Sequence, residues 1–153
     1  MPYYFDSSAL IKRYAPEAGT AWVKQLFNSS SVSQVYFVQI TSIEIAAGLS
    51  RKVRMKEISL KHYHLVLQLF SNDLDKGDYN VVPVSDEIVN LAIALTKRHP
   101  LRAYDALHLA TASHLNTTLV SANLSPITFI SADLELVTAA QGEGLPVDNP
   151  NRY

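Results

Sequence analysis

The chain has 153 residues, of which 48% are hydrophobic and 18% charged, and its net charge is −1 at pH 7. This composition predicts one globular domain over residues 1–153, and it excludes a disordered chain and an overall positive field for nucleic acid. The absence of cysteine excludes disulfides, thiolate metal ligands and cysteine nucleophiles, and no apolar run approaches the roughly 18 residues of a membrane helix. We therefore expect a cytoplasmic protein without a membrane segment.

The first half of the chain alternates strand and helix patterns. An apolar run that ends at Asp6 predicts a buried strand, and a short helix over residues 7–14 follows until Pro16 stops it. The run 35–40 is rich in β-branched and aromatic residues, which predicts a second strand. The other elements expected in this half are a helix over 18–27, a loop over 28–31 and helices over 41–54 and 59–75.

The second half continues the alternation. The expected elements are a strand over 79–84, helices over 87–97 and 102–115, an aperiodic piece over 117–126, a strand over 127–130, a helix from 133 and a short strand over 145–147. Pro83 suggests a strand end or a sheet edge. Residues 119–123 echo 129–133, but only the second copy has a carboxylate and a helix behind it, so we place the functional turn there. The alternation predicts an α/β fold with a mainly parallel sheet of four to five strands covered on both faces.

Four acids stand where a site could form. Asp6, Glu44 and Asp133 each closely follow an apolar strand, so in a parallel sheet they emerge at the same edge. Asp105 lies in an apolar segment that is unusual for an exposed charge. Each acid also has an ordinary structural interpretation. Asp6 and Asp133 fit helix N-caps, Glu44 fits a capping box with Thr41, and Asp105 suits the first turn of its helix.

Convergent carboxylates repel one another, and a divalent cation removes that repulsion. Oxygen ligands without cysteine favour Mg²⁺, with Mn²⁺ as a possible substitute. Such an ion activates water and neutralises the charge that builds on phosphate oxygens, which suits phosphodiester hydrolysis. The residues thus predict one metal site built from Asp6, Glu44, Asp105 and Asp133.

The same residues lie in motifs that resemble those of the PIN-domain ribonucleases, most closely the VapC-type toxins of bacterial toxin–antitoxin pairs. The four segments that resemble the family motifs are residues 4–10 (YFDSSAL), 42–44 (SIE), 104–112 (YDALHLATA) and 130–133 (ISAD). The resemblance covers nearly the full length. It implies a PIN-like three-layer α/β/α sandwich and a Mg²⁺-dependent endoribonuclease.

The resemblance also implies roles for residues and partners. Asp6 and Asp105 would be the direct metal ligands, and Glu44 and Asp133 would complete the catalytic site. It further implies an RNA substrate, a homodimer, and inhibition by a small antitoxin that lies across the early helices.

Other residues near the motifs are weighed beside the acids. His108 lies one turn after Asp105, but a hard ion prefers oxygen, so a packed or hydrogen-bonded histidine is favoured. Ser7, Ser8 and Ser131 could hydrogen-bond Asp6 or a metal water, and we select Ser7 and Ser131 as supporting residues. Two basic clusters either stabilise helix C-termini or contact phosphate: Arg51, Lys52, Arg54 and Lys56, and Lys97, Arg98 and Arg102.

Two other functions remain open at this stage. One is a PIN scaffold that binds RNA or protein without catalysis. The other is phosphotransfer on Asp6, because an aspartate after the first strand can act as a nucleophile. The segment Asp6-Ser7-Ser8 lacks the second aspartate two residues later that haloacid-dehalogenase-type phosphatases use, which makes phosphotransfer the weaker alternative.

Overall fold

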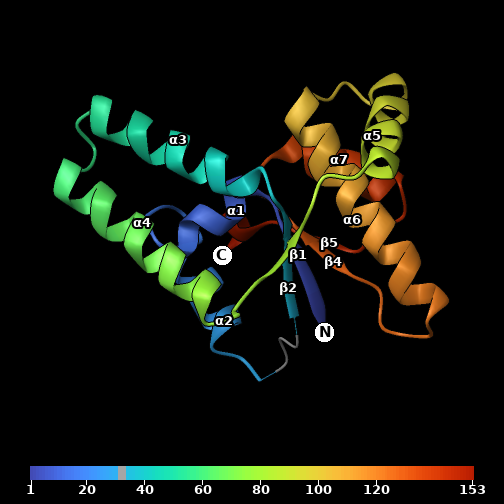
Figure 1. Ribbon diagram of the computed structural model, residues 1–153, viewed down its shortest axis with the longest axis horizontal. Coiled ribbons are helices and arrows are strands. Elements are labelled where there is room, and N and C mark those ends of the chain that lie inside the picture. Colours follow the sequence, from blue (N-terminus) through green and yellow to red (C-terminus); the bar gives the residue numbers. More distant parts are fainter. Residues whose placement is uncertain (31–33) are drawn as a thin grey trace.

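A five-stranded parallel sheet forms the middle layer of the protein (Figure 1). The structure is a computed structural model that describes residues 1–30 and 34–153. The strand order is β3-β2-β1-β4-β5, and every neighbouring pair is parallel. The strands are β1 (Pro2–Phe5), β2 (Gln34–Val38), β3 (Asn80–Val82), β4 (Thr128–Ile130) and β5 (Val147–Asp148). The predicted parallel sheet is confirmed, and Pro83 lies just beyond edge strand β3.

Helices cover both faces of this sheet, which confirms the three-layer arrangement. On one side lie α1 (Ser7–Leu10), the 3₁₀ turn η1 (Ile11–Arg13), α2 (Thr20–Phe27), α3 (Thr41–Arg54) and α4 (Leu60–Asp75). On the other side lie α5 (Asp86–Arg98), α6 (Ala103–Ser121) and α7 (Leu134–Gly142). A second 3₁₀ turn, η2 (Pro150–Arg152), ends the chain. No helix in these described ranges is both long and apolar enough to cross a membrane.

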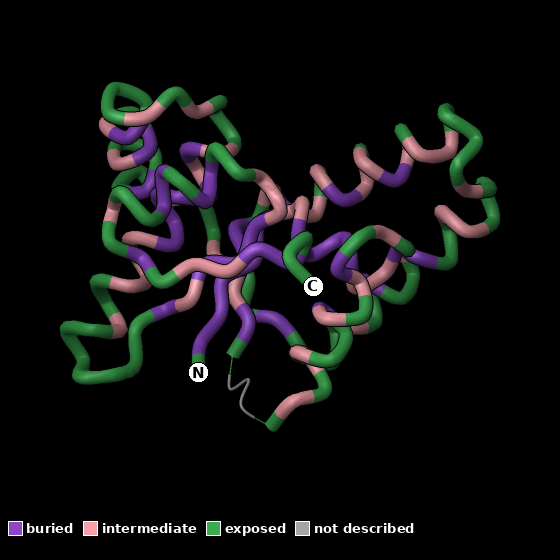
Figure 2. The backbone as a smooth tube through the Cα atoms, turned by 180° about the vertical axis from the view of Figure 1, so that it is seen from behind, coloured by how far each residue is buried: buried purple, intermediate pink, exposed green. Residues whose placement is uncertain are grey.

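The two helical layers have separate apolar cores because the strand side chains alternate between faces. Tyr3 and Phe5 of β1 pack into the core beneath α1 to α4, whereas Tyr4 packs into the core beneath α5 to α7. All four residues of β1 are buried, as the apolar run before Asp6 predicts for a strand covered on both faces. Figure 2 shows the buried backbone concentrated along the central strands.

Helix α6 is longer than the sequence pattern predicts. Residues 117–121 continue the helix, so the aperiodic piece predicted over 117–126 is wrong in its first part, and the segment 119–123 that echoes 129–133 is not a strand. Hydroxyls of Thr117 and Thr118 donate to the carbonyls of Ser113 and His114 one turn earlier, which accommodates these β-branched residues in the helix. The backbone turns only at Asn123, whose φ is +58°. The predicted loop over 28–31 ends at Ser31, which lies outside the described residues.

Candidate active site

Three of the four acids follow adjacent strands of the sheet. Asp6 directly follows β1, and its N–H donates to the carbonyl of Ile130 at 3.1 Å. Glu44 lies in the first turn of α3, just after β2, and Asp133 caps α7, just after β4. Because β2 and β4 flank β1, the topology brings these three acids to one edge. Asp105 reaches the same region from the first turn of α6.

Asp6 is buried and held by a network of hydroxyl groups. Its side chain is 3% exposed and caps α1 by accepting the N–H of Ala9 at 2.9 Å. Ser8 Oγ donates to the Asp6 carboxylate, with both oxygens at 2.8 Å, and Ser131 Oγ donates to Oδ2 at 2.7 Å. Burial raises the pKa of Asp6, and the nearby His108 and these hydrogen bonds only partly oppose that effect.

The serines also join two turns of the chain. Ser8 Oγ accepts the N–H of Ala132, and Ser131 Oγ accepts the N–H of Asp133, both at 3.0 Å. Of the two serines selected from the sequence, Ser131 contacts Asp6 as expected. Ser7 makes no bond to Asp6; its neighbour Ser8 takes that role, because the residue two positions after an N-cap aspartate can fold back onto the carboxylate.

Glu44 bonds to a buried histidine rather than capping its helix. Its Oε1 lies 2.6 Å from Nε2 of His108, and Nδ1 of that ring lies 2.9 Å from the hydroxyl of Tyr4. The capping box with Thr41 is therefore wrong: α3 begins after Ile40 with no side-chain cap. Both ring nitrogens of His108 thus have a partner, Glu44 at Nε2 and Tyr4 at Nδ1. The interpretation of His108 as a hydrogen-bonded core histidine is confirmed, since it is 1% exposed.

Three of the acids line one cleft. Glu44, Asp105 and Asp133 share a cavity of about 380 Å³ with Arg102, Ala103 and Tyr104. Burial raises the pKa of Asp105, and the negative charges of Asp133 and Glu44 raise it further. Asp133 uses Oδ1 to cap α7, accepting from Glu135 and Leu136 at 2.8 and 3.0 Å. Asp6 does not line this cleft; it is buried and bonded to Ser8 and Ser131.

The donor chemistry of this cleft fits a hard divalent cation. Its acids are carboxylates, and their mutual repulsion is the strain that a cation would relieve. As they stand, no three His, Asp or Glu side chains in the described part of the chain are arranged closely enough to hold a metal ion. The carboxylates would therefore have to move closer together around an ion.

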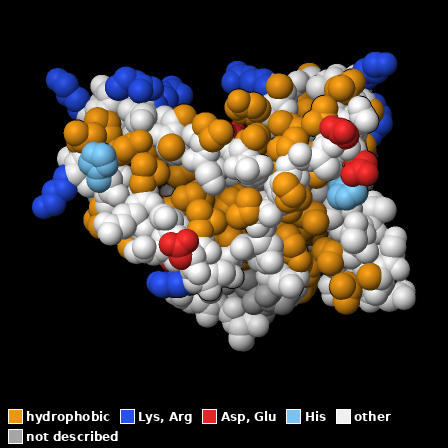
Figure 3. Space-filling view, in the orientation of Figure 1, with side chains coloured by type: hydrophobic (Ala, Val, Ile, Leu, Met, Phe, Trp, Pro, Cys, Tyr) orange, Lys and Arg blue, Asp and Glu red, His pale blue; other side chains and the backbone are white. Residues whose placement is uncertain are grey.

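The basic clusters lie on both sides of the cleft. Figure 3 shows Lys and Arg side chains flanking the hollow at the top of the molecule. Arg102 lines the cleft and partly offsets the raised pKa of Asp105, whereas Arg98 pairs with Glu143 at 2.8 Å. The sequence indicated Arg102 only as part of a basic cluster, and Tyr104, which precedes Asp105 in the third motif, was not singled out as a site residue.

The profile of the PIN domain family matches residues 3–125, which is more than half of the chain. The chain belongs to the PIN domain family. The matched segment contains Asp6, Glu44 and Asp105 and ends before Asp133. This match confirms the family that the sequence motifs indicated. Proteins with a PIN domain are generally nucleases.

Solved structures share the PIN fold across nearly the whole chain. A toxin–antitoxin complex from Klebsiella pneumoniae matches with a TM-score of 0.61 and 21% identity over 97% of each chain. VapBC2 from Rickettsia felis, bound to a DNA fragment from its promoter, matches with a TM-score of 0.60 and 13% identity over 97% of this chain and 98% of that one. PAE2754 from Pyrobaculum aerophilum matches with a TM-score of 0.58 and 17% identity over 99% and 85%. A comparison with curated proteins gives no match.

Proposed function

We propose that this PIN domain is a metal-dependent endoribonuclease, with Mg²⁺ as its ion and Mn²⁺ as a substitute, and that it is the toxin of a toxin–antitoxin pair. One observation carries the proposal: Glu44, Asp105 and Asp133 line a single cleft, and the buried Asp6 follows the strand between those that precede Glu44 and Asp133. Structural carboxylates placed only as helix caps would not need to share a cleft and raise one another's pKa values.

The four carboxylates divide the work of holding the ion. Asp6 and Asp105 would be the direct ligands, and Glu44 and Asp133 would complete the site. Ser8 and Ser131 donate hydrogen bonds to the buried Asp6, and these bonds favour the charged form of its carboxylate against the effect of burial. The hydrogen bond from His108 fixes the position of Glu44 at the cleft wall. A bound divalent cation would supply charge neutralisation on the phosphate and activation of water.

Asp133 has a free oxygen for proton transfer. The N–H groups at the start of α7 occupy its Oδ1, which leaves Oδ2 available on a side chain that lines the cleft. This oxygen orients the attacking water and accepts its proton as the new bond to phosphorus forms. The bond from phosphorus to the leaving ribose oxygen then breaks, and that oxygen takes up a proton.

The proposal extends to partners and location. Two of the similar structures are toxin–antitoxin assemblies, which supports a small antitoxin as the partner of this chain. We also propose a homodimer that acts in the cytoplasm, where its RNA substrate is found. The likeness to these complexes lies in the fold, so both points rest on the family resemblance.

Phosphotransfer on Asp6 is disfavoured by its surroundings. Its side chain is 3% exposed, and both carboxylate oxygens accept hydrogen bonds from serines. A nucleophile needs access to its substrate, which this burial hinders. The remaining alternative is a scaffold that binds RNA or protein without catalysis. Measuring RNA cleavage distinguishes this scaffold from an endoribonuclease.

Cleavage of a mixed RNA pool tests the proposal. Wild-type protein should cut the pool with Mn²⁺ or Mg²⁺ and should not cut it in a chelator. Asp105→Asn removes one ligand and should abolish cutting under the same conditions. Equal cleavage by both proteins would refute the assignment, because the activity would then come from a contaminant or from another site.

A further inference from the structure

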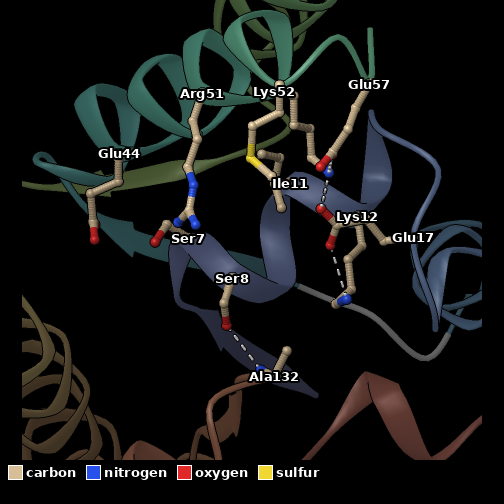
Figure 4. A pocket seen from close by; sticks show the side chains of 12 residues that line it. Ser7, Ser8, Ile11, Lys12, Glu17, Glu44, Arg51, Lys52, Glu57 and Ala132 are labelled. Carbon is tan, nitrogen blue, oxygen red and sulfur yellow. Dashed lines mark hydrogen bonds and ion pairs between the residues drawn. The ribbon is translucent and has the colours of Figure 1, made fainter.

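A second groove opens beside the carboxylate cleft. It has a volume of about 440 Å³ and lies between the α1–η1 segment and the inner face of α3. Glu44 lines both this groove and the cleft, so the two cavities adjoin at that side chain. Figure 4 shows that Ser7 and Arg51 extend into the groove near Glu44. This groove, defined here by Ser7, Glu44 and Arg51, is called the α3 groove below.

The α3 groove contains three cations, and two of them are neutralised. Lys12 pairs with Glu17 at 3.1 Å, and Lys52 pairs with Glu17 at 2.9 Å and with Glu57 at 3.2 Å. Arg51 has no acidic partner within residues 1–30 and 34–153. Its guanidinium therefore keeps its full charge and its forked donors for a ligand.

Ser7 supplies a second free donor on the opposite wall. Ser8 Oγ is committed to Asp6 and Ala132, whereas Ser7 Oγ has no hydrogen-bond partner among the described residues. In Figure 4 the Ser7 hydroxyl lies beside the Arg51 guanidinium. A guanidinium and a hydroxyl that face the same space match the non-bridging oxygens of a phosphate.

Arg51 and Glu44 are seven residues apart on α3, which puts them on the same side of the helix, about 10 Å apart along its axis. If the phosphate that is cleaved lies at the acids, a neighbouring phosphate of the same RNA strand would therefore lie close to Arg51. An acidic peptide in the groove would approach the carboxylates of the cleft without taking part in their chemistry. The position of the groove next to the cleft therefore favours nucleic acid.

We propose that Arg51 and Ser7 form a subsite for a backbone phosphate of the RNA next to the bond that is cut. The subsite rests on the proposed function, because it assumes that RNA is the substrate of the adjoining cleft. It positions the strand without touching the reacting atoms. It also separates Arg51 from the rest of its basic cluster, which serves ion pairs or solvent.

Binding measured without catalysis tests the subsite. A fluorescent single-stranded RNA is titrated with protein in EDTA, so that no strand is cut, and the titration is repeated between about 50 and 200 mM salt. The variants are Arg51→Gln and Ser7→Ala. Arg54→Gln is the matched control, because Arg54 is exposed on the same helix but does not line the groove. Unchanged melting temperatures establish that each variant is folded.

The two variants should fail in different ways. One phosphate contact on a single strand contributes about 0.7 to the slope of log K against log salt, so Arg51→Gln should lower the slope by that amount and weaken binding about fivefold at 0.1 M salt. Ser7→Ala should weaken binding about two- to tenfold with an unchanged slope, because a neutral donor releases no counterion. Arg54→Gln should match wild type.

Other results would overturn the subsite. These are an absence of RNA binding by wild type, equal slopes for Arg51→Gln and Arg54→Gln, or a loss in Arg51→Gln that appears for a poly-glutamate peptide and not for RNA. The last result would assign the groove to an acidic protein segment. Because the titration contains no metal, a positive result stands even if the cleavage assay fails, and the two proposals can fail separately.

Discussion

Replacing His108 with alanine should strongly destabilise the protein, because its ring joins three elements in a buried position. His108 lies on α6, contacts Tyr4 of β1 through Nδ1 and contacts Glu44 of α3 through Nε2. The exposed fractions of His108 and Tyr4 are 1% and 0%. The substitution therefore leaves a cavity and removes the bond between the ring and the buried Tyr4 hydroxyl, which keeps Val38 and Thr111 as neighbours that can bond to it.

The magnitude follows from these two terms. The lost ring contacts and the cavity cost about 2–3 kcal/mol, below the 3–5 of a larger aromatic ring. The lost hydrogen bond to Tyr4 adds about 0.5–1.5 kcal/mol, because Val38 and Thr111 can still bond to that hydroxyl. We expect His108→Ala to lower the free energy of unfolding by about 3–4 kcal/mol. The Glu44 carboxylate is half-buried and can hydrogen-bond to water once the ring is gone, so its lost bond adds little to this cost.

Urea unfolding followed by the fluorescence of Trp22, the single tryptophan, measures this loss. His114→Ala is the control, since His114 is exposed on the same helix and should change stability by less than about 0.5 kcal/mol. The double variant Tyr4→Phe, His108→Ala removes both partners of the Tyr4–His108 hydrogen bond, which the two single variants each lose once. It should cost about 1 kcal/mol less than the sum of the single variants. Additive costs would refute the buried hydrogen bond.

Three further predictions concern the acids. Ser131→Ala should cost about 1–3 kcal/mol in urea unfolding, because buried Asp6 loses a short hydrogen bond, whereas a cost no larger than that of Ser7→Ala would contradict the network. The raised pKa of Asp105 means that the folded state holds its proton more tightly, so metal-free stability should fall as pH rises from about 4 through that pKa. Asp105→Asn should be more stable than wild type at pH 7 without metal, and a less stable variant would argue against the repulsion. Mg²⁺ or Mn²⁺ should raise the melting temperature of wild type but not of Asp6→Asn, and an equal rise in both would rule out a shared metal site.

Local sequence patterns predicted the fold well because each element carries its own signal. The apolar run before Asp6, the β-branched run before Thr41 and the capping serine Ser85 all depend on neighbours in sequence, and the structure has elements at those places. Helix α6 was underestimated because the pattern over 117–121 mixes threonines with apolar residues. Their side-chain bonds to the preceding turn are visible only in three dimensions.

The contacts among the site residues depend on long-range partners, which the sequence does not reveal. Glu44 and His108 are 64 positions apart, and Tyr4 and His108 are 104 apart. From the sequence, Glu44 has a plausible local partner at Thr41, and that local interpretation was wrong. A clue existed in hindsight, because His108 lies on the buried side of an apolar helix, where a polar ring requires partners.

Whether Asp6 can cap a helix and also bind a metal depends on its free lone pairs. A carboxylate offers about four acceptor sites. The donors around Asp6 are the N–H of Ala9 and the hydroxyls of Ser8 and Ser131, and Ser8 has one proton for the two oxygens within its reach. Three donor protons therefore occupy three of the four acceptor sites, and one site stays free for an ion. The burial that raises the pKa of Asp6 would favour a cation at that site, because the cation stabilises the charged form of the carboxylate.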